Sequence, residues 1–147
     1  MSFNNSLSNF DIIKILKDMN IEINGVFSRD DLPDKLKIGF YVVNLDDSTH
    51  SGTHWTSFYY NPVYSIYFDA FGFISPEEVQ NKIKPYMYCD VDIQDIDSSA
   101  CGYYCIAFIK FLYGKHDKYK YFEAFLNLFS SDTKKNDRIL HNILYNY

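Results

Sequence analysis

The stretch DIDSSACGYYCIAFIKFLY, residues 95–113, decides how the rest of this sequence is interpreted. From Cys101 to Tyr113 it is apolar almost all round, with Lys110 as its only charge. A helix that is hydrophobic on every side is normally buried, so we predict a buried helix over residues 101–113. Cys101 stands at its entrance, directly after polar residues. Four roles are open to this cysteine: core residue, half of a disulfide, metal ligand or nucleophile.

Amphipathic helices are predicted on both sides of this buried helix. Two follow it, marked by apolar residues at helical spacing. These are Phe122, Phe125, Leu126 and Phe129 in the first, and Ile139, Leu140, Ile143 and Leu144 in the second. Residues 9–19 show the same spacing, and Ser8 with Asp11 predicts a capping box at the start of that helix.

Strands are predicted in the middle of the chain. Residues 39–45 form a buried apolar run, and the aromatic-rich runs 54–60 and 64–71 flank the sequence NPV as a hairpin. Residues 88–94 alternate between apolar and polar and are predicted as a further strand. A helix followed by strands and then by more helices predicts the α+β class, with a short, antiparallel-rich mixed sheet packed against helices.

The remaining segments of the first half are predicted as two loops and a helix. Residues 25–36 are expected to form a long loop, and residues 46–52 a polar turn. Residues 75–84 are predicted as a helix with Ser75 as N-cap and Pro76 at its first position.

Composition indicates one globular domain covering residues 1–147. The net charge of −5 argues against a generic nucleic-acid binder. The polar start predicts no signal peptide, and no apolar run approaches the ~18 residues of a membrane span. Three cysteines without a secretory signal are typical of a reducing compartment with free thiols, which disfavours the disulfide role for Cys101.

The position of Cys101 favours a reactive thiolate. At a helix N-terminus, unpaired N–H groups and the helix dipole stabilise negative charge. Gly102 adds no side chain beside the sulfur, so the backbone of a substrate can approach closely. Cys105 lies one turn deeper in the apolar run, and we assign it to the core.

A nucleophilic cysteine needs a base, and four histidines compete for that role. His50 and His116 lie in predicted loops, and His141 lies on the last amphipathic helix. His54 alone opens a strand, where a rigid scaffold can hold an imidazole. The structural alternative for His54 is a partly buried strand histidine bonded to the backbone.

The base also needs an acceptor that orients it. An even-length turn centred on residues 61–62 would pair His54 with Asp69, on one face of the sheet with Cβ atoms ~5 Å apart. One imidazole nitrogen should then lie ~2.6–3.2 Å from the Asp69 carboxylate, while the other points at the sulfur of Cys101. The alternative for Asp69 is an ordinary turn residue at a strand end.

Acyl transfer further requires donors for the developing oxyanion. The backbone N–H of Cys101 is one candidate. Gln94, seven residues earlier, can supply a side-chain amide, although a lone glutamine in this place is usually a surface residue.

A zinc site is the alternative from another class of function. Cys101 and Cys105 at i and i+4, with Cys89 and a histidine, could face one metal ion. The sequence lacks C-x-x-C pairs, and Cys105 belongs to an apolar stripe, so this interpretation is disfavoured.

The order His54, Asp69, Gln94, Cys101 and the short motifs around these residues resemble the adenovirus-type maturation proteases. These are related to the proteases that process SUMO and other ubiquitin-like proteins. The matching words are GTHW (52–55), YFDAFGF (67–73), Gln94 and SSACGYYC (98–105). GVFSRDDLP and VVNLDDS resemble the versions found in polinton-like elements, virophages and other large DNA viruses. The resemblance extends over about residues 9–113.

This resemblance implies a papain-like, adenain-like fold and a cysteine endopeptidase that cuts viral capsid and structural precursors near glycine during virion maturation. It implies that His54 is the base, Asp69 its orienter, Gln94 the oxyanion donor and Cys101 the nucleophile. The expected location is the virion, or the host cytoplasm or nucleus where particles assemble. The alternative is the same chemistry acting on ubiquitin-like modifiers of the host.

By the same resemblance, Trp55 is the aromatic residue that narrows the substrate tunnel, and Gly102 is the other residue expected to bind substrate. No metal or cofactor is expected, although enzymes of the family are activated by a peptide and by DNA. The acidic charge predicts weak or no DNA binding here. The adenovirus enzymes carry Glu where this chain has Asp69, whereas the SUMO-type enzymes carry Asp. The role of Cys89 stays open.

Overall fold

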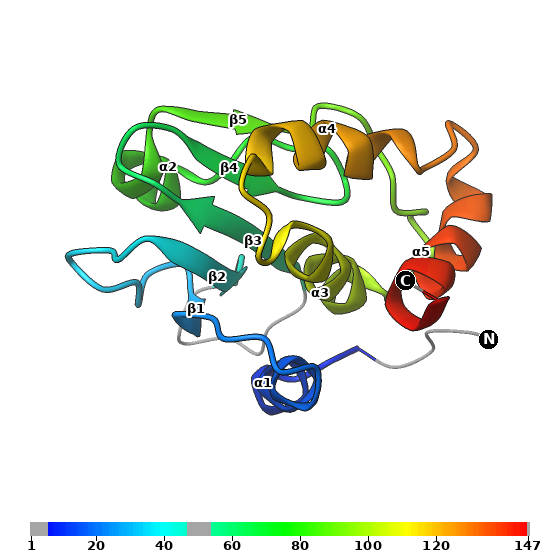
Figure 1. The fold of residues 1–147 in the computed structure, drawn as a ribbon, viewed down its shortest axis with the longest axis horizontal. Helices are drawn as coiled ribbons and strands as arrows, with labels where there is room; N and C mark the ends of the chain where they lie inside the picture. Colours follow the sequence, from blue (N-terminus) through cyan, green and yellow to red (C-terminus); the bar gives the residue numbers. More distant parts are fainter. Residues whose placement is uncertain (1–5, 47–53, 147) are drawn as a thin grey trace.

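A computed structural model describes residues 6–46 and 54–146, and within them it shows a five-stranded mixed sheet surrounded by helices (Figure 1). The elements in chain order are α1 (Asn9–Asp18), β1 (Gly25–Ser28), β2 (Gly39–Asn44), β3 (Trp55–Tyr60), β4 (Ser65–Phe68), α2 (Glu77–Ile83), β5 (Tyr86–Tyr88), α3 (Cys101–Leu112), α4 (Lys118–Asn127), the 3₁₀ turn η1 (Thr133–Lys135) and α5 (Asn136–Asn146). The predicted α+β class is confirmed.

The five strands lie side by side in the order β1-β2-β3-β4-β5. The three central strands are antiparallel, with β3 paired to β2 on one side and to β4 on the other. The two edge strands run parallel to their neighbours. The sheet is therefore mixed, with an antiparallel centre that includes the predicted hairpin.

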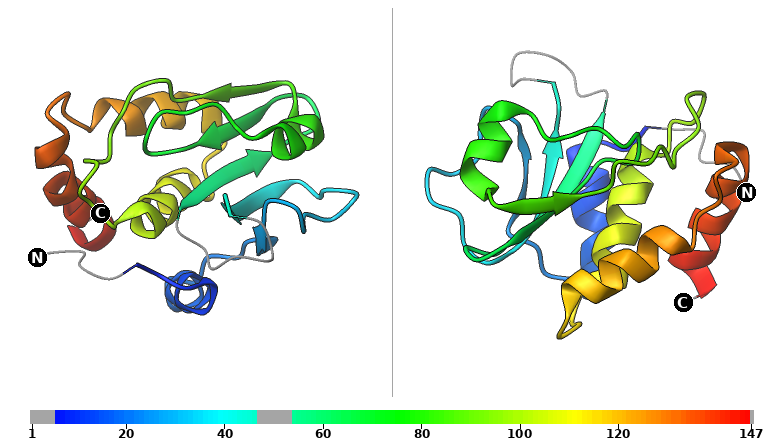
Figure 2. Two further views of the ribbon diagram at one scale, coloured as in Figure 1. Left: turned by 180° about the vertical axis from the view of Figure 1, so that it is seen from behind. Right: turned by 90° about the horizontal axis from the view of Figure 1, so that it is seen from above.

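Alternation along the strands gives the sheet two apolar faces. Phe40 and Phe68 point to the face covered by α3, where the Phe108 ring packs 6.0 Å from the first and 5.3 Å from the second. Tyr41 and Tyr67 point to the opposite face and pack in one cluster with buried residues of α2. Figure 2 shows α2 across the sheet from α3 and α4.

Helix α3 is the buried helix predicted from the opening stretch. It ends at Leu112 and is buried along most of its length. Its single charge, Lys110, extends to the end of α5, where Nζ donates to the carbonyls of Ile143 and Leu144 at 3.0 and 2.8 Å. Carbonyls at a helix end have no partner inside the helix, so this ammonium satisfies two of them. Burial lowers the pKa of Lys110.

The other predicted amphipathic helices are also present. In α1, Ser8 and Asp11 form the predicted capping box: the Asp11 N–H donates to Ser8 Oγ at 3.1 Å, and the Ser8 N–H donates to Asp11 Oδ2 at 2.9 Å. Helices α4 and α5 each turn an apolar face, including Phe125 and Leu140, into the main core.

Three predictions are wrong in detail. Residues 25–36 are not wholly a loop, because the first four form β1 alongside β2. The predicted strand 88–94 ends at once: only Tyr88 belongs to β5, and the chain beyond it bonds to Ala70 instead, through the N–H groups of Ile93 and Gln94. Ala70 lies in the turn that follows β4, so residues 93 and 94 bind a turn and form no strand ladder.

The cap of α2 also differs from the prediction. Pro76, not Ser75, is the N-cap, and no side chain caps this helix. The Ser75 hydroxyl donates instead to the Pro76 carbonyl at 3.2 Å. Most of the predicted polar turn at 46–52 lies outside the described residues.

Candidate active site

The hairpin β3–β4 carries the predicted base and its orienter, but in a different register. Ser57 pairs with Phe68 and Tyr59 with Ile66, so that His54 lies opposite Phe71 when the register is continued, two residues away from the predicted partner. The rings of His54 and Phe71 accordingly stack, with centroids 4.7 Å apart. Direct cross-strand pairing of His54 with residue 69 is therefore wrong.

The turn explains the shift. Asn61 Oδ1 accepts the Val63 N–H at 2.9 Å, and Ser65 Oγ donates to the Asn61 carbonyl at 3.2 Å. Such side-chain bonds centre the turn one residue later than the predicted 61–62 position. Side chains alternate with a period of two, so a shift of two residues leaves His54 and Asp69 on the same face as diagonal neighbours.

The predicted contact between base and orienter is present despite that shift. His54 Nε2 lies 2.9 Å from Asp69 Oδ1. The same oxygen accepts the Phe71 N–H at 2.8 Å, while the Gly72 N–H donates to the Asp69 carbonyl at 2.8 Å. The carboxylate is 1% exposed and fixed at the end of β4 by its own following turn. Asp69 thus begins a turn at the end of β4 and is at the same time a buried acceptor that holds the imidazole.

The imidazole of His54 lies between two groups that favour its charged form. Burial lowers the pKa of His54, but hydrogen bonds to the side chains of Asp69 and Cys101, and the negative charge of each, raise it overall to about 9. Because Nε2 is held by the carboxylate, Nδ1 is the nitrogen left for the sulfur. At neutral pH the ring is therefore a cation that can stabilise a thiolate.

Cys101 is the first residue of α3, preceded by Ala100 as N-cap. The N–H groups in the first turn of a helix have no partner within it, so at the start of α3 they favour a negative charge. The side chain is 5% exposed, which leaves it within reach of solvent at the end of the helix. Cys101 at the start of α3, His54 just before β3 and Asp69 just after β4 are thus brought together by three different elements.

The other two cysteines have different surroundings. Cys105, one turn further along α3, is fully enclosed, and burial raises the pKa of its thiol well above the ordinary value. Burial also raises the pKa of Cys89, whose thiol donates to the Val91 carbonyl at 3.2 Å. All three cysteines are free. Among residues 6–46 and 54–146, no group of three or more His, Cys, Asp or Glu side chains is arranged to hold a metal ion.

Gln94 is buried, so it is not the surface residue that a lone glutamine in this place usually is. Its side chain is 1% exposed, and Nε2 donates to the Ser98 carbonyl at 2.9 Å. A glutamine amide has two N–H donors, so the second stays available to a ligand. Its Oε1 atom has no hydrogen-bond partner among the described residues. The unpaired Oε1 atom is an acceptor, so it fits a donor such as a substrate N–H, whereas only the second N–H of Nε2 suits an oxyanion.

The sequence did not predict a hydrogen-bond network around Ser98, the residue whose carbonyl accepts the Gln94 amide. Asp137, in the first turn of α5, accepts hydrogen bonds from Ser98 and Tyr104. Ser98 also accepts the N–H of Ala100 at 3.2 Å. A Ser-Ser-Ala turn before a helix gives no indication of a partner thirty-nine residues away. No signal in the sequence could have found Asp137.

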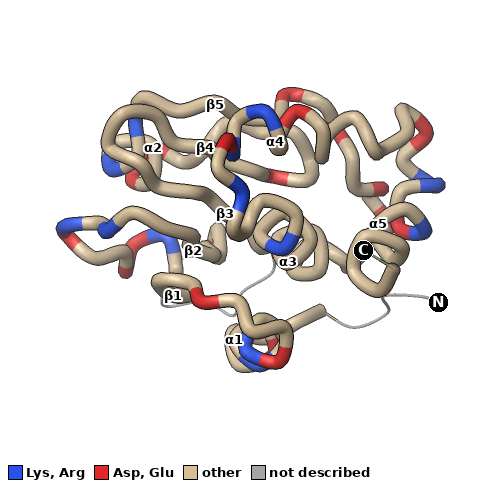
Figure 3. The backbone as a smooth tube through the Cα atoms, viewed as in Figure 1, with Lys and Arg blue, Asp and Glu red and all other residues tan. Residues whose placement is uncertain are grey.

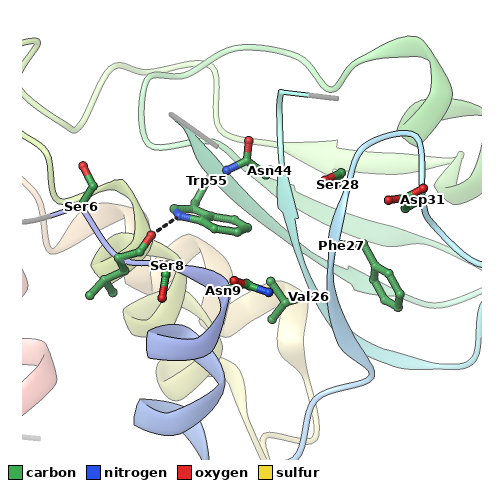
Figure 4. A pocket seen from close by; sticks show the side chains of 10 residues that line it. Ser6, Ser8, Asn9, Val26, Phe27, Ser28, Asp31, Asn44 and Trp55 are labelled. Carbon is green, nitrogen blue, oxygen red and sulfur yellow. Dashed lines mark hydrogen bonds between the residues drawn. The ribbon is translucent and has the colours of Figure 1, made fainter. Parts of the chain in front are cut away.

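Trp55 and Gly102, the two residues predicted to bind substrate, lie close together. A Cβ atom added to Gly102 would lie 3.3 Å from Trp55 Cδ1 and 3.2 Å from two atoms of Leu7. The indole N–H donates to the Leu7 carbonyl at 2.8 Å, which fixes the ring against the chain just before α1 (Figure 4). No bulkier residue than glycine fits at position 102 without a shift of its neighbours.

A cavity of about 590 Å³ opens beside Trp55. Its wall combines small polar side chains with the apolar Val26 and Phe27 of the edge strand β1, as Figure 4 shows. The lining residues are Ser6, Leu7, Ser8, Asn9, Val26, Phe27, Ser28, Asp31, Asn44 and Trp55. The space is large enough for several side chains of a peptide and begins at the rim of the site.

Basic residues are scattered over several elements and do not line one face (Figure 3). Acidic residues gather near the site, on the segment that carries Gln94: Asp90, Asp92, Asp95 and Asp97. Burial and the neighbouring charges of Asp95 and Asp69 raise the pKa of Asp92.

No helix among the described residues is long and apolar enough to cross a membrane. No protein-family model matches the chain, and no curated protein matches it either. What the chain does must therefore follow from the chemistry of its own residues.

Proposed function

We propose that this protein is a cysteine endopeptidase, with Cys101 as nucleophile, His54 as base and Asp69 as orienter. One observation carries the proposal: a buried carboxylate holds His54 Nε2 at 2.9 Å, while the same ring bonds to a cysteine at the N-terminus of a buried helix. A nucleophile, a base in contact with it and a third group that orients the base are the arrangement that thiol proteases need.

The proposed reaction is thiolate acyl transfer. The sulfur of Cys101 attacks the peptide carbonyl, and the backbone N–H of Cys101 with the side-chain amide of Gln94 stabilises the oxyanion. The imidazolium of His54 then gives its proton to the leaving amine, which leaves a thioester. Water attacks the thioester while His54 accepts its proton; the carboxylic acid product and the Cys101 thiolate then separate, which restores the thiolate and imidazolium pair. Side chains and backbone of this chain supply every group, so the mechanism uses no metal or cofactor.

The proposed substrates are viral capsid and structural precursor proteins, cut near glycine during virion maturation. The narrow contact of Trp55 with Gly102 supports a preference for a small residue at the cut. The placement of the helix α3 against the sheet supports an adenain-like variant of the papain-like fold. Assembly sites in the host cytoplasm or nucleus, and the virion itself, are the proposed locations, and a peptide activator is compatible with this arrangement.

The second candidate keeps this chemistry but takes conjugates of ubiquitin-like modifiers as substrates. Asp69 favours it, because the SUMO-type enzymes that the sequence resembles carry Asp at this position. Modifier tails that end in glycine would also pass the contact between Trp55 and Gly102. Cleavage of a modifier conjugate without cleavage of any precursor would support this candidate over capsid maturation.

The experiment incubates the purified protein with a capsid precursor, a modifier conjugate and a library of peptides, and maps new termini by mass spectrometry. We expect cuts next to glycine in the precursor and in the library. Cys101→Ser keeps the shape of the site but replaces the thiolate with a hydroxyl, so cutting should stop. New termini produced equally by the parent and Cys101→Ser would refute the proposal.

A further inference from the structure

We infer that Asp137 is a positioning residue for the oxyanion side of the site. This inference rests on the proposed function. The Asp137 carboxylate accepts Ser98 Oγ at 3.1 and 3.0 Å through its two oxygens, and the Tyr104 hydroxyl at 2.9 Å through the first of them. One residue of α5 thus holds both the turn before Cys101 and the helix that begins there.

The Ser98 hydroxyl passes this constraint to the backbone. A hydroxyl has one proton, and here it points at the Asp137 carboxylate. Its lone pairs therefore face the Ala100 N–H, which donates to Ser98 Oγ at 3.2 Å. The Ser98 carbonyl meanwhile accepts Gln94 Nε2 at 2.9 Å. Both donors proposed for the oxyanion are thus adjacent to the turn that Asp137 holds.

Tyr104 forms the second attachment, one turn into α3. Burial and the negative charge of Asp137 raise the pKa of Tyr104, so its hydroxyl keeps its proton and remains a donor. Hydrogen bonds to a charged acceptor are about twice as strong as neutral ones. The carboxylate lies in the first turn of α5, where the helix dipole favours a negative charge.

Neighbours of Asp137 hold the same segment at other points. Asn136 Nδ2 donates to the Ile93 carbonyl at 2.8 Å, and Thr133 Oγ1 donates to Asp95 Oδ1 at 3.0 Å. Figure 1 shows α5 beside α3. Asn136 thus holds the peptide between Ile93 and Gln94, whereas Asp137 holds Ser98, whose carbonyl accepts the Gln94 side-chain amide.

The first test compares two neutralising substitutions in this segment. Asp137→Asn keeps the shape of the side chain but removes the charged acceptor, and we expect kcat to fall about tenfold with KM within twofold. The matched control is Asp132→Asn, which removes a carboxylate that only caps η1, through the Lys134 N–H at 3.2 Å. The control should keep kcat within twofold of the parent. A kcat for Asp137→Asn within twofold of the parent would overturn the inference.

The second test asks whether Asp137 acts through the oxyanion donors. In a Gln94→Ala background one of the two donors is gone, so adding Asp137→Asn should lower kcat further by clearly less than tenfold. A merely structural role would give the same tenfold loss in both backgrounds. That additive result would count against positioning through Gln94.

A third measurement needs no peptidase activity. Hydrogen exchange followed by mass spectrometry should show residues 94–101 exchanging several-fold faster in Asp137→Asn, with strands β2 and β3 unchanged. Ser98→Ala, which breaks the same attachment, should give the same pattern if Asp137→Asn does not fold. If the parent protein cuts no substrate but Asp137→Asn still exchanges faster over residues 94–101, only the proposed function is refuted. Unchanged exchange over 94–101 would refute the positioning role, whatever the protein cuts.

Discussion

The two sides of the site are built in different ways. On the base side, His54 and Asp69 stand at the ends of paired strands, and their separation is set by the ladder of backbone bonds between β3 and β4. On the oxyanion side, residues 94–98 belong to no strand or helix and are held by side chains of the segment around Asp137. The base side is local in sequence, whereas the oxyanion side depends on the far end of the chain.

This difference has consequences for stability. A strand ladder opens only when several bonds and the packed faces of the sheet are lost together. The oxyanion side depends on single side-chain bonds, each of which contributes about 1 kcal/mol net, or somewhat more where a carboxylate accepts. Local opening should therefore begin on the oxyanion side.

The largest expected effect is at Cys101, where the two sides meet. Cys101→Ala should leave a folded protein with no peptidase activity, because the sulfur forms the bond to substrate. Cys105→Ala, one turn deeper in the same helix, should stay active and lose on the order of 1 kcal/mol of stability. Peptide cleavage and thermal unfolding of both variants check this contrast. Full activity in Cys101→Ala would refute the whole assignment.

Next in size is the base side. Asp69→Asn removes the charge that holds His54 Nε2 and should lower kcat by roughly 10⁴-fold, as loss of an orienting carboxylate does in other triads. Steady-state kinetics with a peptide substrate measures this loss. Thr56→Ser, a change in the neighbouring buried strand that retains the hydroxyl bond to the Val43 carbonyl, is the control and should stay within a few-fold of the parent. A similarly small loss in Asp69→Asn would show that His54 needs no orienter.

The oxyanion side should show a smaller loss. Gln94→Ala should lower kcat by roughly 10²-fold, the usual effect of removing one oxyanion donor. Gln94→Glu should be slower still, because it sets a negative charge against the forming anion. Single-turnover acylation rates of both variants separate this step from product release. Rates within threefold of the parent in both would remove Gln94 from the reaction.

The same division decides what could be predicted from the sequence. Periodicity predicted α3 with Cys101 at its start, and alternation placed His54 and Asp69 on one face of the sheet even though the register was wrong by two. Local patterns predict where a helix lies and which face of a strand a side chain takes, because neighbouring residues in the chain determine both. Nothing local could assign β1 in the predicted loop, or reveal Asp137 behind Ser98, because each depends on a partner distant in sequence.

The pKa of His54 provides a test of the base side through stability. It is raised from 6.5 to about 9 in the folded protein, so the folded state binds the proton more tightly. The resulting stabilisation, about 3 kcal/mol, should be fully present below pH 6.5 and lost as the pH rises to 9. Asp69→Asn should show a shallower fall over this window in urea unfolding. Parallel curves for the two proteins would show that the carboxylate does not hold the imidazolium.

The smallest effect is expected at the rim, where substrate enters between the two sides. Gly102→Ala adds a Cβ atom 3.2 Å from Leu7 and 3.3 Å from Trp55, a contact that a small movement of the Leu7 side chain can relieve. Alanine also favours a helix over glycine by up to about 1 kcal/mol, so the thermal midpoint should hardly change. The added methyl group would press on Leu7 and Trp55 at the proposed rim of the site, so KM should rise about fivefold while kcat changes less than twofold. Alkylation of Cys101 by iodoacetamide, a small reagent, should keep the rate of the parent and serves as the control. A KM equal to that of the parent would show that substrate does not pass between Trp55 and Gly102.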